Sequence, residues 1–288
     1  MPALARATRP VRARPQRAVP RPFMKWVGGK TQLLEQLVSR MPEDIGTYYE
    51  PFIGGGALFF ALKPEKAVLG DYNSELIGTY QAVRDRLPEL VEILEGHYYE
   101  KNYFYSVRSM DPSTLSPTQA AARTIYLNRT GFNGLYRVNS KGQFNVPFGR
   151  YSNPLICDHR NLEACSSLLH RADLRQGSYE HVLASAQSGD FTYLDPPYVP
   201  LSKTSNFTGY IPGGFGAEDQ EKLAQLLVDL DRRGVRFMLS NAGSDASRAL
   251  YKDLPIKSLR IETVQARRSV NSRTSGRGKV DEILVLNY

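Results

Sequence analysis

Short apolar and β-branched runs alternate with stretches of helical periodicity along most of the chain. A short apolar run between turn residues predicts a buried strand, and apolar residues three or four positions apart predict an amphipathic helix. The pattern predicts helices over 33–38 and 218–233, and strands over 48–50, 67–71, 173–176, 191–194, 235–240 and 281–286. Strands that alternate with helices are typical of an α/β protein with a mostly parallel sheet.

Residues 76–165 break this alternation. The stretches 76–100 and 117–127 have helical character and contain many tyrosines. Alternating apolar and polar residues then flank the turn sequence Asn-Ser-Lys-Gly at 139–142, which predicts a β-hairpin. The expected organisation is a basic disordered tail at 1–22, a catalytic domain in two parts at 23–75 and 166–288, and an inserted, mainly helical domain at 76–165 that carries the hairpin.

The composition is ordinary for a soluble globular protein, with 41% hydrophobic and 23% charged residues. There is no apolar run long enough to span a membrane, and the first residues lack the apolar core of a secretory signal. Cys157 and Cys165 are too few for a disulfide framework, and the histidines have no metal-ligand spacing with them. We therefore expect a cytoplasmic protein without a membrane segment or a bound metal.

The net charge of +8 is unevenly distributed. All arginines of the tail precede the first acidic residue, Glu35, and a second acid-free group consists of Arg267, Arg268, Arg273, Arg277 and Lys279. Such clusters favour a polyanionic partner, most simply nucleic acid. For the tail, two alternatives stay open: a disordered segment without a dedicated role, and a transit peptide, which the absence of serine disfavours.

Two glycine-rich turns precede helical stretches. The segment 28–31 (Gly-Gly-Lys-Thr) is similar to a phosphate-binding loop, but Met24 stands where the first glycine of that motif belongs, so we exclude an NTPase. Gly54–Gly56 follows the first strand, and such a turn lets the backbone approach a ligand at a helix N-terminus. The next strand ends at Asp71, a position where an acid commonly holds a ribose. A nicotinamide cofactor would fit these two elements equally well.

Asp195-Pro196-Pro197-Tyr198 directly follows the predicted strand 191–194. Prolines stop the ladder, so a rigid loop is expected at the edge where open α/β sheets bind ligands. A carboxylate, a peptide carbonyl and an aromatic ring together suit an exocyclic amino group on a flat heterocycle. The alternative is a strand-ending turn with a capping Asp and a packed Tyr.

The predicted hairpin combines Arg, Asn, Gln and Lys with aromatic residues. Such side chains contact base edges and stack on bases, so the hairpin is a candidate for reading nucleic acid. A solvated hairpin packed by its own aromatic residues is the alternative.

These segments together resemble the D12-class (α-group) N6-adenine DNA methyltransferases, most closely the DNA adenine methyltransferase type. The similarity covers essentially everything after residue 22, and the family's order is kept through 23–30, 50–56, 71–73, 128–151, 195–198, 206–208 and 279–282. The Asp-Pro-Pro-Tyr segment and the stretch 144–151 are specific to the family, whereas the glycine turn is not.

The resemblance implies a Rossmann-like sheet that binds S-adenosyl-L-methionine. It implies a cofactor site formed by Trp26, Gly28, Lys30, Glu50, Phe52, Gly54, Gly56, Asp71 and Asp195, in which Asp71 holds the ribose. The implied catalytic residues are Asp195, Pro196, Pro197 and Tyr198. In the family pattern the tyrosine ring stacks on an extruded adenine, while the Asp195 carboxylate and the Pro196 carbonyl accept its N6 hydrogens.

The resemblance also implies that the partner is duplex DNA, read at GATC through the hairpin. Arg137 is the expected guanine reader, and Leu135 and Pro147 are expected beside thymine, assisted by Asn133 and Tyr151. Phe132 stands where such enzymes often carry a tyrosine that wedges into the duplex. The remaining expected DNA contacts are Lys25, Arg129, Asn206, Arg267 and Arg268. We further expect a monomer associated with the nucleoid, with a possible restriction endonuclease as its counterpart in the host.

Several alternatives remain open at this point. One is a methyltransferase that acts on cytosine N4 or on adenine in RNA, although Asp before Pro-Pro favours adenine and the hairpin favours duplex DNA. Another is a non-catalytic DNA-binding regulator on the same fold, against which the intact Asp71, Asp195 and Tyr198 argue. A nicotinamide-dependent oxidoreductase is disfavoured because a substrate acid/base pair is missing.

Overall fold

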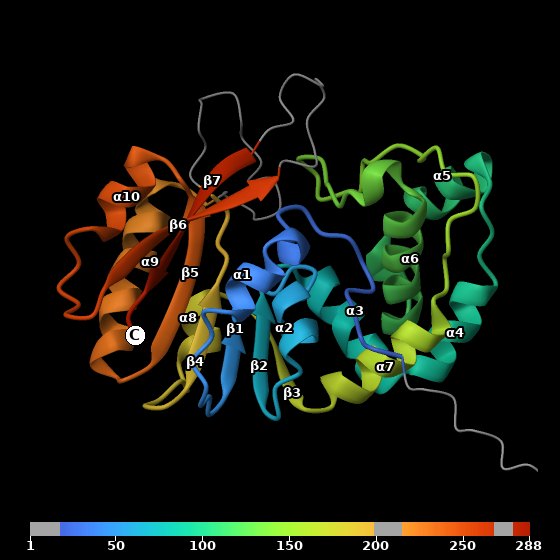
Figure 1. Ribbon diagram of the computed structural model, residues 1–288. Coiled ribbons are helices and arrows are strands. Elements are labelled where there is room, and N and C mark those ends of the chain that lie inside the picture. Colours follow the sequence, from blue (N-terminus) through green and yellow to red (C-terminus); the bar gives the residue numbers. More distant parts are fainter. Residues whose placement is uncertain (1–17, 199–214, 268–278) are drawn as a thin grey trace, which may run out of the picture.

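A central β-sheet organises the molecule in the computed structural model, which describes residues 18–198, 215–267 and 279–288 (Figure 1). Within these residues the sheet has seven strands: β1 (Tyr48–Glu50), β2 (Ala67–Asp71), β3 (Ala172–Gln176), β4 (Phe191–Leu194), β5 (Arg236–Ala242), β6 (Arg260–Arg267) and β7 (Lys279–Leu286). Their spatial order is β3-β2-β1-β4-β5-β7-β6. Neighbours from β3 to β5 are parallel, whereas β7 is antiparallel to both β5 and β6. The predicted α/β fold with a mostly parallel sheet is confirmed.

The strand order reverses between β1 and β4. From β1 the chain proceeds outward through β2 to β3, and then returns to place β4 on the other side of β1. At such a switch point the connections leave in opposite directions, and ligands of open α/β sheets bind beside the carboxyl ends of these strands. Glu50 ends β1 and Asp195 directly follows β4, so two predicted site residues lie at this place.

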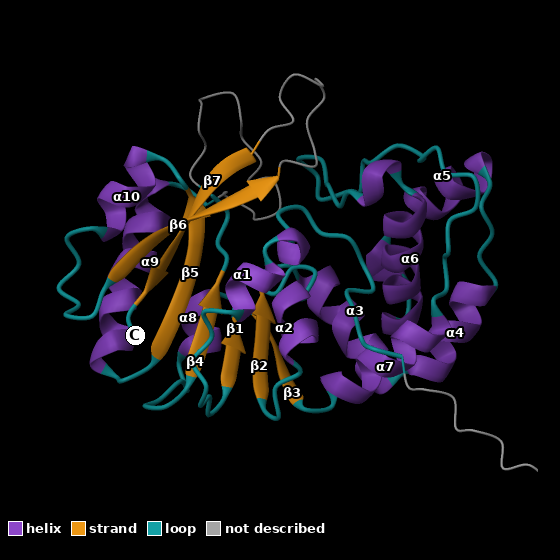
Figure 2. Ribbon diagram, viewed as in Figure 1, coloured by secondary structure: helices purple, strands orange, loops and turns teal. Residues whose placement is uncertain are grey.

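Helices cover both faces of the sheet (Figure 2). One hydrophobic cluster contains residues of α1 (Leu34–Val38), α2 (Ala57–Leu62), α3 (Ser74–Asp85) and α7 (His159–Leu169), and the other contains residues of α8 (Tyr179–Leu183), α9 (Ala217–Arg232) and α10 (Asp245–Tyr251). Successive strand residues point to opposite faces, so Tyr48 belongs to the first cluster and Tyr49 to the second. Burial on both faces explains why these strands are continuous apolar runs in the sequence.

A group of helices follows β2 in the chain, and many of its hydrophobic residues belong to the same cluster as those on the first face of the sheet. It contains α3, α4 (Leu87–Glu95), α5 (Lys101–Ser109), α6 (Pro117–Thr130) and α7, and it lies beside the sheet (Figure 1). Ser116 and Gln119 form a capping box that begins α6. A smaller core of its own includes Phe104, Tyr126 and Phe144. The helices predicted over 76–100 and 117–127 are confirmed. The first of these stretches forms two helices, α3 and α4, which meet at Arg86. That 76–165 acts as a separate recognition domain stays a prediction.

The predicted hairpin is only partly regular. Antiparallel bridges join Val138 to Phe144 and Gly131 to Phe148, but they are isolated and do not form a named strand. The amide of Asn145 donates to the carbonyl of Arg137 at 2.9 Å, which closes the turn. A longer ladder is interrupted because residues 132–134 form a short 3₁₀-helix and Pro147 has no amide hydrogen to donate.

The strand β6 was not predicted from the sequence. In the described part of the chain it lies at the edge of the sheet and has β7 as its one partner. Among its residues with described side chains, Val264 alone is buried, so the stretch has no continuous apolar signal. A polar, one-sided strand of this kind is typical of a sheet edge.

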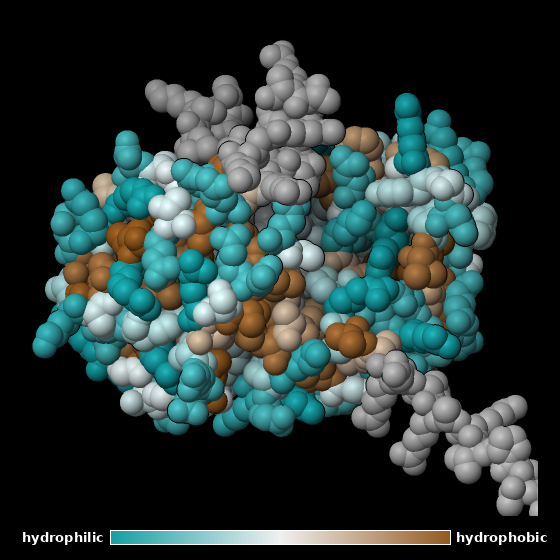
Figure 3. Space-filling model, in the orientation of Figure 1, coloured by the Kyte–Doolittle hydropathy of each residue, from teal (hydrophilic) through white to brown (hydrophobic). Residues whose placement is uncertain are grey.

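The described surface is mainly hydrophilic in the view of Figure 3, with hydrophobic residues gathered over α1 and α2. Among the helices that the structure describes, none is long and apolar enough to cross a membrane.

Candidate active site

The loop that follows β4 is held by a buried amide side chain. Asp195 retains 17% exposure of its side chain, while Pro196 is buried. The amide of Gln220, on α9, donates to the Pro197 carbonyl at 2.8 Å, and its own oxygen accepts from Asn241 of β5 at 3.1 Å. Both amide side chains are fully buried. Sequence reasoning missed them, although polar residues within otherwise apolar stretches were the available signal.

Lys30 and Asp195 form a buried ion pair at the switch point. Lys30 Nζ lies 2.7 Å from Asp195 Oδ1, and the lysine side chain is only 7% exposed. The same ammonium donates to the Gly28 carbonyl at 2.8 Å and lies 4.9 Å from the centre of the Tyr198 ring. Burial raises the pKa of Asp195 to about 6, an effect that the Glu282 charge adds to and the Lys30 charge opposes. Asp195 is therefore mainly anionic at neutral pH.

The hydroxyl of Tyr198 contacts the antiparallel part of the sheet. It donates to Oε2 of Glu282 at 2.6 Å. Glu282 lies on β7, where its backbone is paired with Ala242 on one side and Val264 on the other. Sequence reasoning gave Glu282 no role, because nothing in a local pattern indicates which loop a strand residue will face.

Glu50 lies beneath the surface of the site. It is 3% exposed, and Oε2 accepts from the Tyr48 hydroxyl at 2.8 Å. Burial raises its pKa to about 8, and the neighbouring charge of Asp195 acts in the same direction. Glu50 is therefore mainly protonated at neutral pH, which suits a supporting group better than an anion in contact with a ligand.

The glycine turn lies between β1 and α2 and contacts the end of β2. Gly54 and Gly56 have φ values of 46° and 68°, which favour glycine. Asp71 accepts from the Gly54 amide at 3.2 Å, and burial raises the pKa of Asp71 to about 6. A Cβ atom at Gly54 would come within 2.8 Å of the Trp26 ring, so the indole and the turn pack closely. An acid, a glycine turn and an indole in contact fit a nucleoside ligand.

Other predicted cofactor residues border this region. The ring of Trp26 stacks on Tyr136 with centroids 4.9 Å apart. Phe52 packs against Tyr179 and Phe215, at centroid distances of 5.4 and 6.0 Å.

The segment after α6 presents most of the predicted DNA contacts to solvent. Phe132, Asn133, Arg137 and Pro147 are exposed, and Leu135 and Tyr151 are half-buried. Arg137 Nε donates to the side chain of Asn145 at 2.7 Å, which restrains the guanidinium. In Figure 1 this segment lies in the upper part of the view, on the side toward which β1 and β2 point.

The side chain of Asn128 joins the segment around Lys25 to the segment around Gly134 by hydrogen bonds. Its side chain accepts from the Lys25 amide at 2.9 Å and donates to the carbonyls of Lys25 and Gly134, both at 2.9 Å. Lys25 is exposed, and its ammonium lies 5.6 Å from the centre of the Tyr151 ring. The buried asparagine was not singled out from the sequence, although it lies within the segment that carries the resemblance.

Some of the predicted DNA-contacting residues do not lie in the exposed segment after α6. The Arg129 side chain is half-buried, which lowers its pKa, and the charges that act on it include Asp158 and Arg21. Within the described part of the chain its Nε has no hydrogen-bond partner. Arg267 ends β6, while Asn206 and Arg268 lie outside the described residues.

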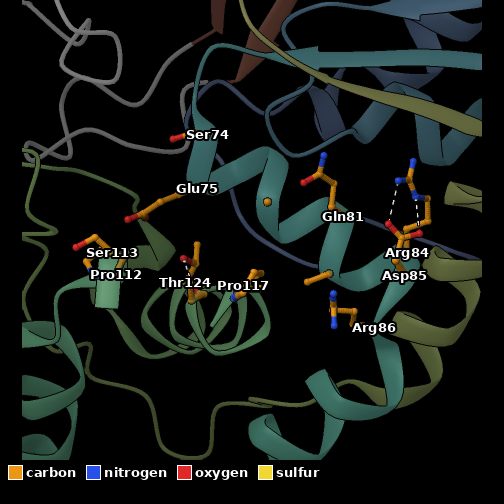
Figure 4. A pocket seen from close by; sticks show the side chains of 14 residues that line it. Ser74, Glu75, Gln81, Arg84, Asp85, Arg86, Pro112, Ser113, Pro117 and Thr124 are labelled. Atoms are coloured by element: carbon orange, nitrogen blue, oxygen red, sulfur yellow. Dashed lines mark hydrogen bonds and ion pairs between the residues drawn. The ribbon is translucent and has the colours of Figure 1, made fainter. Parts of the chain in front are cut away.

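A cavity of about 630 Å³ lies between α3 and α6, away from this site (Figure 4). Its lining includes Glu75, Gln81 and Thr124 but none of the predicted catalytic residues, so we do not assign the reaction to it. The described residues contain no group of three or more His, Cys, Asp or Glu arranged to hold a metal ion.

The model of the D12 class N6 adenine-specific DNA methyltransferases matches residues 26–270. The chain belongs to this family. The methyltransferase is 47% identical to the Type II methyltransferase M1.LlaDCHI of Lactococcus lactis subsp. cremoris, over 93% of this chain and 95% of that one. It is 38% identical to the Type II methyltransferase M.MjaIII of Methanocaldococcus jannaschii, over 93% and 99% of the two chains. It is 34% identical to the DNA adenine methylase of Escherichia coli K12, over 92% and 95%.

Membership of this family confirms the resemblance and the expected activity. The methyltransferase acts on adenine in DNA and uses S-adenosyl-L-methionine as its methyl donor. The oxidoreductase alternative is thereby excluded.

With Asp195 as the acceptor for the target amine, the role proposed below, its pKa predicts a pH dependence of methyl transfer. Because burial raises this pKa from the usual 3.8 to about 6, the carboxylate is lost already as the pH falls through 6. A protonated carboxyl group is a poorer acceptor, so the single-turnover rate should fall tenfold per pH unit below this value. Saturating cofactor separates this effect from Asp71, whose pKa is also about 6. A rate independent of pH between 5 and 7 would contradict the prediction.

Proposed function

We propose that the methyltransferase modifies N6 of adenine within GATC in duplex DNA, with Asp195, Pro196 and Tyr198 gripping the target base. The observation that carries the proposal is the segment that follows α6, with Arg137 and Pro147 exposed, which lies on the side of the molecule toward which β1 and β4 point (Figure 1). The relatives named DNA adenine methylase, about 34% identical, support the choice of sequence.

Specific side chains of the exposed segment suit base reading. The guanidinium of Arg137, restrained by Asn145, can donate two hydrogen bonds to the O6 and N7 atoms of a guanine. Leu135 and Pro147 offer apolar contact for the methyl group of thymine. Phe132 is 46% exposed and can stack in the space that an extruded base leaves. The contacts of Arg137, Leu135 and Pro147 would distinguish the G and T positions of a short site.

The cofactor site is assigned to the turn Gly54–Gly56 with Trp26, Lys30, Asp71 and Asp195. The Asp71 carboxylate beside the glycine turn suits a ribose diol, and the Trp26 ring borders that turn. Lys30 keeps Asp195 in place through the 2.7 Å ion pair. When bound, S-adenosyl-L-methionine supplies an electrophilic methyl group on a sulfonium.

The loop after β4 overcomes the weak nucleophilicity of adenine N6. Its lone pair is delocalised into the ring, and acceptors on both N6 hydrogens favour a pyramidal nitrogen that directs the lone pair outward. The Asp195 carboxylate and the Pro196 carbonyl provide these acceptors, and their fixed positions stabilise the positive charge that develops on N6. Asp195, with a pKa of about 6, can then take up the proton that N6 loses.

The target base must leave the duplex before the reaction. Extrusion costs a few kcal/mol, which stacking on an aromatic ring partly offsets. Tyr198 is the aromatic side chain of the loop itself, and the ring lies beside the Lys30–Asp195 pair. We assign the stacking role to this ring.

The recognition sequence can be tested without assuming it. Genomic DNA from cells that lack adenine methylation, and that express the protein, would be sequenced by a method that detects N6-methyladenine at single bases. We expect modification at the adenine of GATC and an unmodified genome when the Asp195→Ala variant is expressed. Modification centred on another motif would contradict the proposed sequence but not the chemistry.

The arginine-rich tail is proposed to contact phosphates. Arg21 itself is held on α7, because it pairs with Asp158 at 2.5 Å and its amide donates to Asn161. A truncation should therefore remove residues 1–17 and keep Arg21. We expect the slope of log K against log salt to become shallower by about 0.9 for each phosphate that the shortened protein no longer neutralises. An unchanged slope in fluorescence-anisotropy titrations would show that the tail does not bind DNA.

We also propose that the methyltransferase acts as a monomer, since one exposed segment is sufficient to read a short site. Its similarity to relatives named Type II methyltransferases supports a restriction endonuclease as its counterpart in the host. Association with the nucleoid would follow from the DNA substrate.

A further inference from the structure

The contact between Tyr198 and Glu282 joins the loop after β4 to a strand on the far side of β5. The two residues are 84 positions apart in the sequence, and their side-chain oxygens are 2.6 Å apart. A tyrosine ring in a loop can rotate about its Cα–Cβ bond, which would change the plane offered to a base. The hydrogen bond from the Tyr198 hydroxyl to Glu282 restricts this rotation.

We propose that Glu282 is a positioning residue that holds the Tyr198 ring in the orientation required to stack on the extruded adenine. The inference rests on the stacking role proposed above for Tyr198. It adds a residue to the reaction that contacts neither the base nor the cofactor, but acts through the tyrosine.

Glu282 is placed on a rigid support. The neighbouring residues Ile283 and Leu284 are fully buried, and β7 is paired along both edges. A hydrogen bond from a phenol to a carboxylate is charge-assisted and therefore stronger than one between neutral groups. The position of the acceptor is thus fixed by the sheet and not by a loop.

The Tyr198 ring is restrained by three different contacts. Glu282 holds the hydroxyl, and the Lys30 ammonium lies 4.9 Å from the ring centre, within the range of a cation–π interaction. The backbone before the ring is fixed by Gln220, which donates to the Pro197 carbonyl. Of these contacts, the one with Glu282 fixes the position of the hydroxyl and therefore the rotation about the Cα–Cβ bond.

A pair of substitutions separates the hydrogen bond from the charge. Glu282→Gln and Glu282→Leu both remove the negative charge near Asp195, but only glutamine keeps an oxygen that can accept from the tyrosine. Asp281→Asn is the matched control, because Asp281 is the preceding residue on β7 and its side chain is exposed. Thermal unfolding of each variant checks that the sheet is intact.

The measurement is the single-turnover rate of methyl transfer at saturating cofactor, on a duplex that the unaltered protein methylates. The same duplex with 2-aminopurine at the target position reports stacking of the extruded base through its fluorescence. We expect Glu282→Leu to be slower than Glu282→Gln by about fivefold, the effect expected when a hydrogen bond between neutral groups is lost. The 2-aminopurine emission should rise in the leucine variant, and Asp281→Asn should match the unaltered protein.

Tyr198→Phe completes the test, because phenylalanine keeps the ring and lacks the hydroxyl. It should be as slow as Glu282→Leu, and the double variant should be no slower than either single one. Equal rates for Glu282→Leu and Glu282→Gln, or multiplied losses in the double variant, would overturn the proposal. Full activity of Tyr198→Ala would instead refute the stacking role of Tyr198 itself, so the two failures are distinguishable.

Discussion

Replacement of Asp195 by alanine is expected to abolish methyl transfer while DNA affinity is largely preserved. The carboxylate is the anionic acceptor that the proposed mechanism places on the N6 amine. Loss of one preorganised polar group of this kind lowers turnover by about a hundredfold or more in other enzymes. The measurement is the single-turnover rate with labelled cofactor, together with DNA binding by anisotropy.

The ion pair with Lys30 calls for a second variant. Alanine at position 195 leaves a lysine that is only 7% exposed without its partner, and an unpaired buried charge is destabilising. Asp195→Asn keeps the volume and one acceptor oxygen, so it should fold well and still lose most of the rate. Turnover within tenfold of the unaltered protein, in a variant that unfolds at the normal temperature, would refute this role of Asp195.

Replacement of Arg137 by alanine is expected to weaken recognition at a single base pair. A bidentate contact to guanine contributes about 1–3 kcal/mol of discrimination, so the loss should be seen with the guanine-containing site and not with a site already substituted there. The ratio kcat/KM on duplexes with every base at each position of the site measures this directly.

Arg150 offers a matched control for Arg137. It is exposed, lies in the same segment and was not assigned a base contact. Arg150→Ala should change binding to all duplexes by a similar factor or leave it unchanged. A uniform loss for Arg137→Ala as well would identify that arginine as a phosphate contact and would contradict its role in reading guanine.

The central strands were predictable because they are buried on both faces. The strand over 191–194 has the predicted bounds, and the run at 67–71 became β2. Burial of this kind leaves a continuous apolar signal in the sequence. The edge strand β6 has no such signal, since β7 is its one strand neighbour among the described residues and most of its described side chains are not buried. The hairpin was predicted as more regular than it is, because alternation alone does not show that Pro147 and the 3₁₀ turn interrupt the ladder.

The candidate catalytic residues of the loop after β4 could be named from the sequence. The residues that hold this loop in place could not. Gln220 reaches Pro197 from 23 positions away, and Glu282 reaches Tyr198 from 84 positions away. Such contacts depend on which strands become neighbours and in what register. No local pattern contains this information, so the supporting residues emerged only from the fold.

The most direct test of the account is methylation of three duplexes that differ only in containing GATC, GTTC or GATG. Each would be incubated with the purified protein and radiolabelled S-adenosyl-L-methionine, then digested to nucleosides and chromatographed. We predict label in N6-methyladenine from the GATC duplex and little from the other two. Equal label in all three would contradict the proposed reading by Arg137, Leu135 and Pro147, and label in cytosine would contradict the grip of Asp195 and Tyr198 on adenine.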